Sequence, residues 1–443
     1  MSAFKEIVAT AALGIGLMAI HTASFAAGPE STYTQLPNDL SVGSSNATIL
    51  TTTVTLPTAS YVYVQSDGRV FPAGAAIAAL SIWADGGEIS NDSVIDWSKT
   101  TNAQQHSYNV IGATYLAAGT HVLRVNASTL NGASFVVGAG SNLSVMTSPA
   151  DTVMVSRVAQ DTAPLSFATA GLKRGSPLPH QPLVSQMINT GGRATVALAS
   201  GRAFLGGAPG DPLTAIYLNG QEPANNVGTW ADNDTWKGAE NQSPFFNHAF
   251  YAQPGNQATV SWDASALPYC EDDSCSGLVN IVNYKVGAGS TLVTLSGMTV
   301  AGSAPTAYTA YNRTNYIDIG SSSGVPPTGT NVVLAQADIV IPQGHNGVVL
   351  FTGKSRVQGD GADAGGTVSM WLAIDGVQRG STGIQQLRLP DCVSTRTIGT
   401  SYLSAAPGER LAPGTHHVTL YGRADGSFKH MSMTRDLPLL WFD

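Results

Sequence analysis

Apolar and polar residues alternate with a period of two over short runs along most of the chain. Examples of such runs are TILTTTVTL (48–56), YVYVQ (61–65), ATVSW (258–262) and THHVTLYG (415–422). Clusters of Gly, Pro, Asn or Asp separate the runs. Alternating runs bounded by turn residues are typical of β-strands in sandwiches and barrels. The pattern therefore predicts an all-β fold.

The runs recur in the same order in three parts of the chain. In each part a glycine is followed by an aromatic residue 15, 16 or 18 positions later, in the pairs Gly68–Trp83, Gly201–Tyr217 and Gly353–Trp371. A turn glycine follows the aromatic after a further 36, 38 or 43 positions. The kept order favours one repeated module over chance recurrence of turns. Because the period exceeds about 100 residues, the copies are expected to be tandem globular domains rather than solenoid repeats.

The repeat predicts three jelly-roll-like β-sandwich modules of about 120 residues, each with about eight strands. We place them at residues 30–150, 178–303 and 325–443. The stretches between them, 151–177 and 304–324, are expected to be connectors, because segments 161–181 and 314–329 are rich in Pro, Gly or Ser, as linkers usually are. Residues 150–160, which contain MVSRVA, are expected to form one further strand.

Residues 1–26 have the features of a secretory signal peptide. Lys5 precedes an apolar run from Ile7 to Ile20, and small residues, Ser24 and Ala26, stand before a suitable cleavage point. No later segment is long and apolar enough to predict a transmembrane helix. We therefore expect an exported protein, secreted or on a cell surface.

Charge narrows the set of partners. Only 11% of the residues are charged, against roughly 25% in average proteins, and the formal net charge is -8. No run of Lys or Arg occurs. This composition argues against nucleic acid and against anionic membrane surfaces as partners.

The ends of the first and third copies carry a resemblance to a known fold. The phrase Gly-Thr-His-x-Val-x-Leu at 414–420 and the alternating leucines at 436–442 resemble the last two strands of jelly-roll modules in bacterial and phage surface proteins. Those modules are similar to the C1q/TNF-type fold. The resemblance implies a trimer-forming adhesive or structural head, in which other copies of the chain are partners or three modules of one chain form an internal pseudo-trimer.

Two adjacent histidines, His416 and His417, follow the turn of the third copy. His416 aligns with His121 in the first copy and with Gln257 in the middle one. A zinc site needs three or four ligands at defined spacing, and no second histidine or cysteine stands at such a spacing here. A structural role is therefore favoured, in which the first histidine ties a hairpin turn, while the second stays unexplained.

Two further positions repeat in the three copies. An Asp-Gly or Asn-Gly pair between strands predicts a tight hairpin turn, and the residues concerned are Asp85, Asn219 and Asp375. An aromatic residue shortly before this turn is expected to pack in the core of each module, and the residues concerned are Trp83, Tyr217 and Trp371.

Acidic loops are candidates for calcium, which prefers oxygen ligands on flexible loops. The carboxylates are Glu271, Asp272 and Asp273 in the inserted CEDDSC segment, and Asp360 and Asp363 in GDGADAGG. The competing interpretation is a solvated turn, and apart from calcium no cofactor is indicated.

The cysteines that bracket the inserted segment, Cys270 and Cys275, are expected to form a disulfide, which export would permit. The remaining Cys392 is expected to be a buried thiol.

The segment WADNDTW in the middle copy is a candidate glycan contact. Aromatic faces stack on the C–H faces of sugars, while acids and amides bind the hydroxyls. The residues concerned are Trp230, Asp232, Asp234 and Trp236. The competing interpretation is a loop folded onto its own aromatic side chains.

No catalytic constellation stands out, because no G-x-S-x-G motif occurs and histidines are scarce. The sequence favours a secreted, non-enzymatic structural or adhesion protein with surface glycans as candidate partners. An alternative is an exported hydrolase of polysaccharides with a catalytic middle module, for which Glu222, Asp263 and Asp375 are candidate carboxylates. A third alternative is a bare binding module attached to an assembly.

Overall fold

A computed structural model describes most of the chain beyond residue 29. The described residues are 30–90, 92–97, 105–149, 154–160, 165–173, 180–189, 194–205, 210–221, 229–230, 240–252, 257–268, 278–286, 290–296, 308–309, 317–320, 326–344, 348–360, 366–387, 394–404, 409–426, 430–433 and 437–442. Their regular structure is strand alone, so the prediction of an all-β fold is confirmed. Within these residues, no helix exists that could cross a membrane.

The first sandwich pairs a six-stranded sheet with a five-stranded one. The six-stranded sheet has the order β1-β11-β4-β10-β2, with β8 also paired to β4. Its strands are β1 (Glu30–Gln35), β2 (Leu40–Val42), β4 (Ser60–Pro72), β8 (His106–Leu116), β10 (Phe135–Val137) and β11 (Asn142–Pro149). The five-stranded sheet has the order β3-β9-β5-β6, with β7 paired to β5. Its strands are β3 (Ala47–Leu56), β5 (Ile77–Ala84), β6 (Gly87–Glu88), β7 (Ser93–Asp96) and β9 (Gly119–Thr129).

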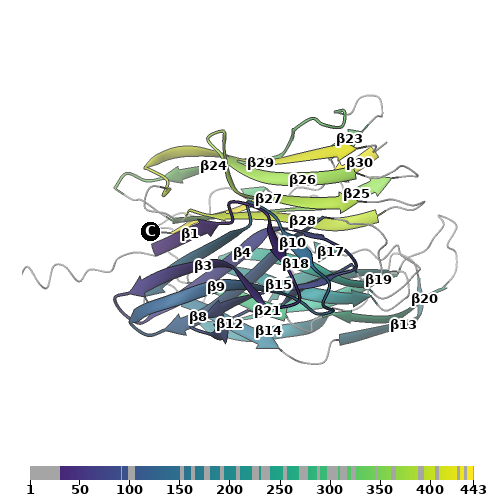
Figure 1. Ribbon diagram of the computed structural model, residues 1–443, viewed down its shortest axis with the longest axis horizontal. Helices are drawn as coiled ribbons and strands as arrows, with labels where there is room; N and C mark the ends of the chain where they lie inside the picture. Colours follow the sequence, from purple (N-terminus) through teal and green to yellow (C-terminus); the bar gives the residue numbers. More distant parts are fainter. Residues whose placement is uncertain are drawn as a thin grey trace, which may run out of the picture.

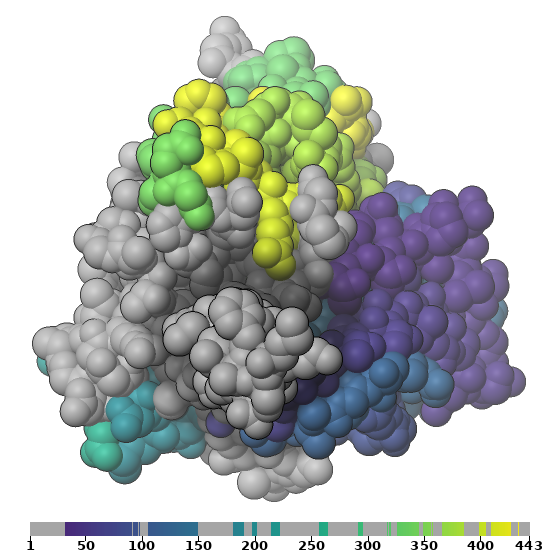
Figure 2. Space-filling model, turned by 90° about the vertical axis from the view of Figure 1, so that its left-hand side faces the viewer, coloured from purple at the N-terminus to yellow at the C-terminus, as the bar shows by residue number. Residues whose placement is uncertain are grey.

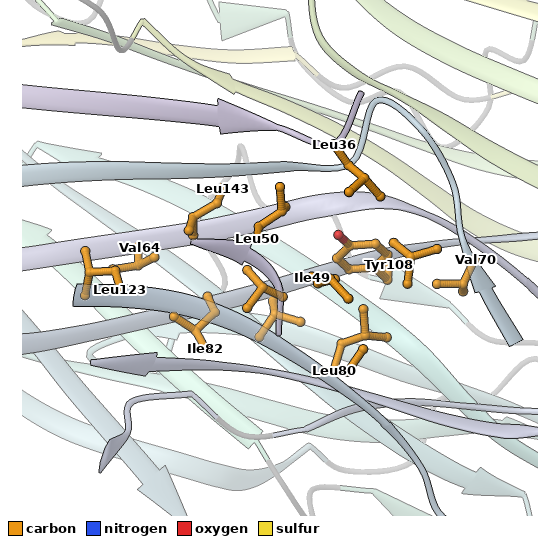
Figure 3. Packing of buried hydrophobic residues seen from close by; sticks show 14 of the residues in the cluster. Leu36, Ile49, Leu50, Val64, Val70, Leu80, Ile82, Tyr108, Leu123 and Leu143 are labelled. Atoms are coloured by element: carbon orange, nitrogen blue, oxygen red, sulfur yellow. The ribbon is translucent and has the colours of Figure 1, made fainter. Parts of the chain in front are cut away.

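The core of this sandwich lies between its two sheets (Figure 3). Every second residue of a strand points to the same face, so alternation sends Leu80 and Ile82 of β5 and Leu123 of β9 inward. They meet Val64 of β4 and Leu143 of β11 from the other sheet. Burying each such side chain contributes about 1.5–3 kcal/mol, which makes this apolar layer the main stabilising term.

The second sandwich repeats the arrangement. Its six-stranded sheet has the order β12-β21-β15-β20-β13, with β18 paired to β15, and its other sheet has the order β14-β19-β16-β17. The strands are β12 (Met154–Gln160), β13 (Leu165–Lys173), β14 (Gln181–Asn189), β15 (Ala194–Leu205), β16 (Gly210–Leu218), β17 (Thr229–Trp230), β18 (Glu240–Ala252), β19 (Gln257–Pro268), β20 (Leu278–Val286) and β21 (Ser290–Ser296). A hydrogen bond of 3.0 Å from Gln186 Nε2 to Thr294 Oγ1 joins the two sheets.

The third sandwich has the same order again. Its six-stranded sheet is β22-β31-β25-β30-β23, with β28 paired to β25, and its other sheet is β24-β29-β26-β27. The strands are β22 (Tyr308–Thr309), β23 (Ile317–Gly320), β24 (Val332–Ile341), β25 (Val348–Asp360), β26 (Gly366–Ile374), β27 (Val377–Leu387), β28 (Ser394–Leu403), β29 (Gly414–Gly426), β30 (His430–Met433) and β31 (Leu437–Phe442). In Figure 1 most of these strands lie above those of the other two sandwiches.

The six-stranded sheets of the second and third sandwiches begin inside the stretches that were expected to be connectors, where only the strand at 150–160 was predicted. Residues 151–177 contain β12 and β13, and residues 304–324 contain β22 and β23. These strands pair with β21, β20, β31 and β30, the later strands of the second and third sandwiches. Pro, Gly and Ser therefore mark turns between short strands here as well as links between domains.

The inner faces of the three six-stranded sheets meet in one buried apolar cluster, called here the central cluster. The first sandwich contributes Tyr63, Ile111, Ala113 and Met146, the second Leu198, Val293 and Leu295, and the third Leu350 and Leu403. Figure 2 shows the described residues of the sandwiches in separate sectors, purple to blue, teal, and green to yellow. Strands from all three sandwiches of one chain thus contribute to a common centre.

The central cluster predicts that the sandwiches lose stability together. We expect Leu350→Ala to lower the free energy of unfolding by about 2–5 kcal/mol, because it leaves a cavity shared by all three sandwiches. Urea unfolding followed by tryptophan fluorescence measures the loss. Leu130→Ala is the control, since Leu130 is 57% exposed and its truncation should change stability by less than about 0.5 kcal/mol. Equal stability of the two variants would contradict the shared core.

Candidate functional site

Most residues that the sequence singled out for ligand or ion binding lie outside the described residues. They are Asp232, Asp234, Trp236, Glu271, Asp272, Asp273, Asp363 and the cysteines Cys270, Cys275 and Cys392. Trp230 ends β17, whose partner is β16, and Asp360 ends β25, where it pairs with His430 of β30. The side chains of Trp230 and Asp360 are not among those described. The expected glycan, calcium and disulfide sites therefore stay predictions.

The repeated Asp-Gly and Asn-Gly turns have the geometry that the sequence predicted. Asp85, Asn219 and Asp375 have φ values of 48°, 48° and 50°. The glycines that follow them, Gly86, Gly220 and Gly376, also have positive φ. Two consecutive positive φ values define the type I′ hairpin turn, whose twist matches that of the flanking strands. The interpretation of these three residues as turn formers is confirmed.

In the first and third sandwiches the turn carboxylate also holds the neighbouring strand. Asp85 Oδ1 accepts a hydrogen bond of 2.9 Å from the N–H of Val122, and Asp85 Oδ2 lies 2.5 Å from Nδ1 of His121. In the third sandwich Asp375 Oδ1 accepts the N–H of His417 at 2.8 Å, and its Oδ2 lies 2.8 Å from Nδ1 of His416. We call each arrangement a turn clamp.

Both ring nitrogens of each clamp histidine face acceptors. Nε2 of His121 lies 2.9 Å from the carbonyl oxygen of Ala117, and Nε2 of His416 lies 2.8 Å from that of Ala412. A ring with an acceptor at each nitrogen must donate twice, which requires the imidazolium form. The bond to the Asp85 carboxylate is the main cause that raises the pKa of His121. Burial lowers the pKa of His416, but the Ala412 carbonyl and the Asp375 carboxylate together outweigh it and raise that pKa.

The middle sandwich has the turn but no histidine. Asn219 Oδ1 accepts the N–H of Thr259 at 2.9 Å, so Thr259 is the counterpart of Val122 and His417. Ala258, and not Gln257, therefore corresponds to His416. The alignment of Gln257 with His416 was wrong by one residue, because the strand after the middle turn begins one position later relative to its glycine.

The second histidine, His417, has a surface role. Its Nδ1 lies 2.5 Å from Oδ1 of Asp338, its direct cross-strand neighbour on β24. The two side chains are 71% and 60% exposed, so the pair is open to solvent and screened. Among the described residues no group of three His, Cys, Asp or Glu side chains is placed to hold a metal ion.

The repeated aromatic residues face outward instead of into the core. Leu80, Ile82 and Ala84 of β5 are buried in the core, which places Trp83 on the opposite face, where it is half-buried. Tyr217 and Trp371 are likewise half-buried. Trp83 and Tyr217 stand two residues before the turn, whereas Trp371 stands four before it. The positions of the third copy were thus misaligned by two residues. Because a shift of two keeps a residue on the same strand face, the alternation of apolar and polar positions did not show the error.

The third sandwich carries an aromatic pair on this outer face. Trp371 of β26 is the cross-strand partner of Tyr421 of β29. Their rings are nearly parallel, at 16°, with centroids 5.6 Å apart. The first sandwich has Ser81 opposite Asn126 at the corresponding place, so the pair there is polar.

Polar and apolar side chains frame the aromatic pair. Val333, the partner of Tyr421 on β24, is 42% exposed and extends the apolar row. Gln336 is exposed on the same strand, and Arg423 follows Tyr421 on β29. Nε of Arg423 lies 2.8 Å from each carboxylate oxygen of Asp425, which orients its guanidinium. We call Val333, Gln336, Trp371, Tyr421 and Arg423 the outer platform.

The outer platform combines the types of group that suit a hydroxyl-rich ligand with an apolar C–H face. Flat aromatic faces stack on apolar C–H surfaces, and the amide and guanidinium donate to hydroxyl oxygens. On β29 the residues from His417 to Asp425 that share the outward side span about 27 Å, with Thr419 among them buried. This is long enough for an extended chain of several sugar units.

The two described carboxylates among those considered for hydrolysis, Asp263 and Asp375, belong to different sandwiches. Asp375 belongs to a turn clamp in the third sandwich. Asp263 lies on β19 of the second, where burial raises its pKa while a hydrogen bond from Ser261 lowers it. Glu222 lies outside the described residues.

No protein-family model and no curated protein matches the chain. Among solved structures, the C-terminal domain of EclA, a sugar-binding protein, is 18% identical, with 27% of this chain and 80% of that one covered and a TM-score of 0.17. PNGase F, a glycosylasparaginase from Flavobacterium meningosepticum, is 10% identical, with 60% and 96% covered and a TM-score of 0.28. A family 35 carbohydrate binding module from Clostridium thermocellum is 13% identical, with 27% and 98% covered and a TM-score of 0.16. With TM-scores this low, the likenesses carry no argument about function.

The turn clamp predicts different effects for two substitutions of one residue. Asp375→Ala removes both acceptors and leaves an alanine at positive φ, so we expect a loss of about 1–3 kcal/mol in the free energy of unfolding. Asp375→Asn keeps an acceptor for the His417 N–H, as Asn219 does in the middle sandwich, and should cost under about 1 kcal/mol. Urea denaturation measures both. Equal losses would show that the side-chain acceptor does not matter.

The turn clamps also predict that the stability of the folded protein depends on pH. His121 and His416 should titrate above the ordinary histidine value of about 6.5. Because the folded-state pKa is raised, the stabilisation is fully present below about pH 6.5 and is lost as pH rises through the raised value. NMR titration of the ring resonances measures the midpoints, with His121→Gln and His416→Gln assigning the signals. Midpoints at or below the ordinary value would refute the doubly donating rings.

Proposed function

We propose that the protein is an exported, non-enzymatic β-sandwich protein of a cell or particle surface, which binds saccharides through the outer platform. The observation that carries the proposal is the parallel Trp371–Tyr421 pair on an outward-facing sheet. Two half-buried aromatic rings on the outward-facing side of a sheet form an apolar surface outside the core of the sandwich. Such surfaces commonly mark binding sites.

The rigidity of the outer platform supports this function. Trp371 and Tyr421 stand on paired strands, and the Arg423 guanidinium is held by Asp425. A site whose groups are already positioned loses little conformational entropy when a ligand binds. A flat sheet also suits a linear saccharide better than a compact ligand, because it presents contacts along a line.

The wider role in adhesion or in building a coat rests on other features. The predicted signal peptide supports export, and the low share of charged residues fits an extracellular surface protein. The segment with Trp230, Asp232, Asp234 and Trp236 stays a proposed second saccharide contact, and association with other copies of the chain stays a proposed partner interaction.

A glycan array with matched variants tests the outer platform. The full-length exported protein should bind a set of glycans, and Trp371→Ala and Tyr421→Ala should each weaken binding about tenfold, because each removes one stacking face. The control is Trp83→Ala, which removes a half-buried aromatic residue from the outer face of the first sandwich and should leave binding unchanged. Thermal unfolding checks that the variants stay folded.

The possible results separate the parts of the proposal. Absence of binding by the unmodified protein would refute saccharide binding. Binding that survives both substitutions would refute the outer platform as its site and would direct attention to the loop with Trp230 and Trp236.

A further inference from the structure

A polar layer adjoins the central cluster where the three sandwiches meet. On β4, Tyr63 belongs to the cluster, and alternation directs Gln65 and Asp67 to the same inward face. Both are buried, with 1% and 2% of their surface exposed. A carboxyl group at this depth is costly unless it is paired or neutral, so its partners decide its state.

One oxygen of Asp67 is well supplied with donors. Asp67 Oδ1 accepts a hydrogen bond of 2.5 Å from Ser401 Oγ, which belongs to β28 of the third sandwich. It also accepts one of 3.1 Å from Asn142 Nδ2. The Ser401 hydroxyl in turn accepts a hydrogen bond from Gln65 Nε2. All these donors are neutral, so none of them supplies a counter-charge.

The other oxygen of Asp67 has no partner in the described part of the chain, and neither has Asn109 Oδ1. These two residues are direct cross-strand partners on β4 and β8. Side chains of such partners lie on the same sheet face, so both face the centre. The main-chain oxygen of Asn109 accepts a hydrogen bond of 3.0 Å from Ser200 Oγ of the second sandwich. The pair therefore sits at the junction of all three sandwiches.

A single proton satisfies both oxygens. We infer that Asp67 is protonated on Oδ2 in the folded protein, donates this proton to Asn109 Oδ1, and so forms a pH-sensitive joint between the three sandwiches. The proton comes from solvent and turns the carboxylate into a neutral acid. Its loss above neutral pH leaves a buried negative charge opposite an amide oxygen, which weakens the joint.

The surroundings favour the neutral acid. Burial raises the pKa of Asp67 to about 7, although hydrogen bonds from Ser401, Asn142 and Gln65 act in the opposite direction. Burial and the nearby Asp67 carboxyl raise the pKa of Tyr63 on the same strand. Burial and the carboxyls of Asp67 and Glu409 raise that of Tyr33 on β1. Tyr402, next to Ser401 on β28, donates a hydrogen bond to Glu409, and burial raises the pKa of Tyr402 while the Arg379 guanidinium acts to lower it.

Within the described part of the chain, further titratable groups on β4 and nearby strands are Tyr108, Arg69 and Lys354. Burial raises the pKa of Tyr108 on β8, with a hydrogen bond to Ser66 acting against it. Arg69 of β4 is directed to Asp39, 3.8 Å from its Oδ1. Lys354 of β25 is buried on the sheet face that Leu350 shares with the central cluster, two positions beyond Thr352, the cross-strand partner of Ser401, and it has an interaction of its own.

The direction of the pH effect follows from the raised pKa. The folded protein holds the Asp67 proton up to about pH 7, whereas an unfolded aspartate releases it near pH 4. The stabilisation is therefore complete below about pH 4 and is lost as pH rises to about 7. Between these two pH values the unfolding equilibrium constant should rise up to tenfold per pH unit. Above about pH 7 the effect of Asp67 on this constant should no longer change with pH.

Urea unfolding tests the joint. It is measured for the full-length protein and for Asp67→Asn at half-unit steps from pH 4.5 to 8.5. An Asn side chain donates to Asn109 Oδ1 and accepts from Ser401 as the neutral acid does. The ratio of the two unfolding constants should rise up to tenfold per pH unit to about pH 7 and then level off. A ratio independent of pH would overturn the inference.

The proton itself is measured by the ¹³C chemical shift of the Asp67 carboxyl in aspartate-labelled protein, which does not depend on how Asp67→Asn folds. The signal should titrate near pH 7 and should vanish in Asp67→Asn. Ser401→Ala removes a donor to the ionised form and should move the midpoint to higher pH. A midpoint near 4 would show that Asp67 is ionised, with the Asn109 amide turned to donate, and would overturn the inference.

Discussion

The structure depends on the burial of each six-stranded sheet on both of its faces. One face packs against the smaller sheet of its own sandwich, and the other turns toward the central cluster. In β4 the consequence is nearly continuous burial, although the sequence SYVYVQSDGRVFP alternates between apolar and polar residues. Polar residues that would face water in an isolated sandwich face the other sandwiches instead.

This constraint divides the surface of the protein by function. Inner faces are taken up by contact between the sandwiches, so a ligand that needs a sheet surface has only the outer faces of the smaller sheets. The outer faces differ although the topology repeats. Where the third sandwich has Trp371 beside Tyr421, the first has Ser81 beside Asn126. The shared fold preserves the frame, and the residues that point away from it are free to differ.

The centre combines two kinds of contact that respond differently to conditions. The apolar cluster with Leu198 and Leu350 holds the sandwiches together without reference to pH. The adjacent layer with Asp67 and Ser401 joins the first sandwich to the third through a buried titratable group. Burial of a carboxyl among neutral donors makes the strength of this contact depend on a proton, which apolar contacts alone cannot do.

Short-range features were predictable because their causes lie within a few residues. The Asp-Gly and Asn-Gly turns require positive φ, and the residues that accept such angles are few. The structural role of His416 at a turn followed from the comparison of copies, whereas its partner Asp375 became known only from the structure. The comparison of copies did not give the exact register of the strands. A slip of one residue at Gln257, or of two at Trp371, preserves the overall pattern of apolar and polar positions.

The sequence by itself determined that this is an all-β protein built from a repeated module with type I′ turns, because alternation and turn chemistry act locally. Only the tertiary structure decided that Asp67 is buried, that Trp371 and Tyr421 form a pair, and that His417 meets Asp338. Each of these depends on which residues stand opposite one another across strands and between sandwiches. Residues more than 300 positions apart, such as Asp67 and Ser401, become neighbours only when the sheets close on a common centre.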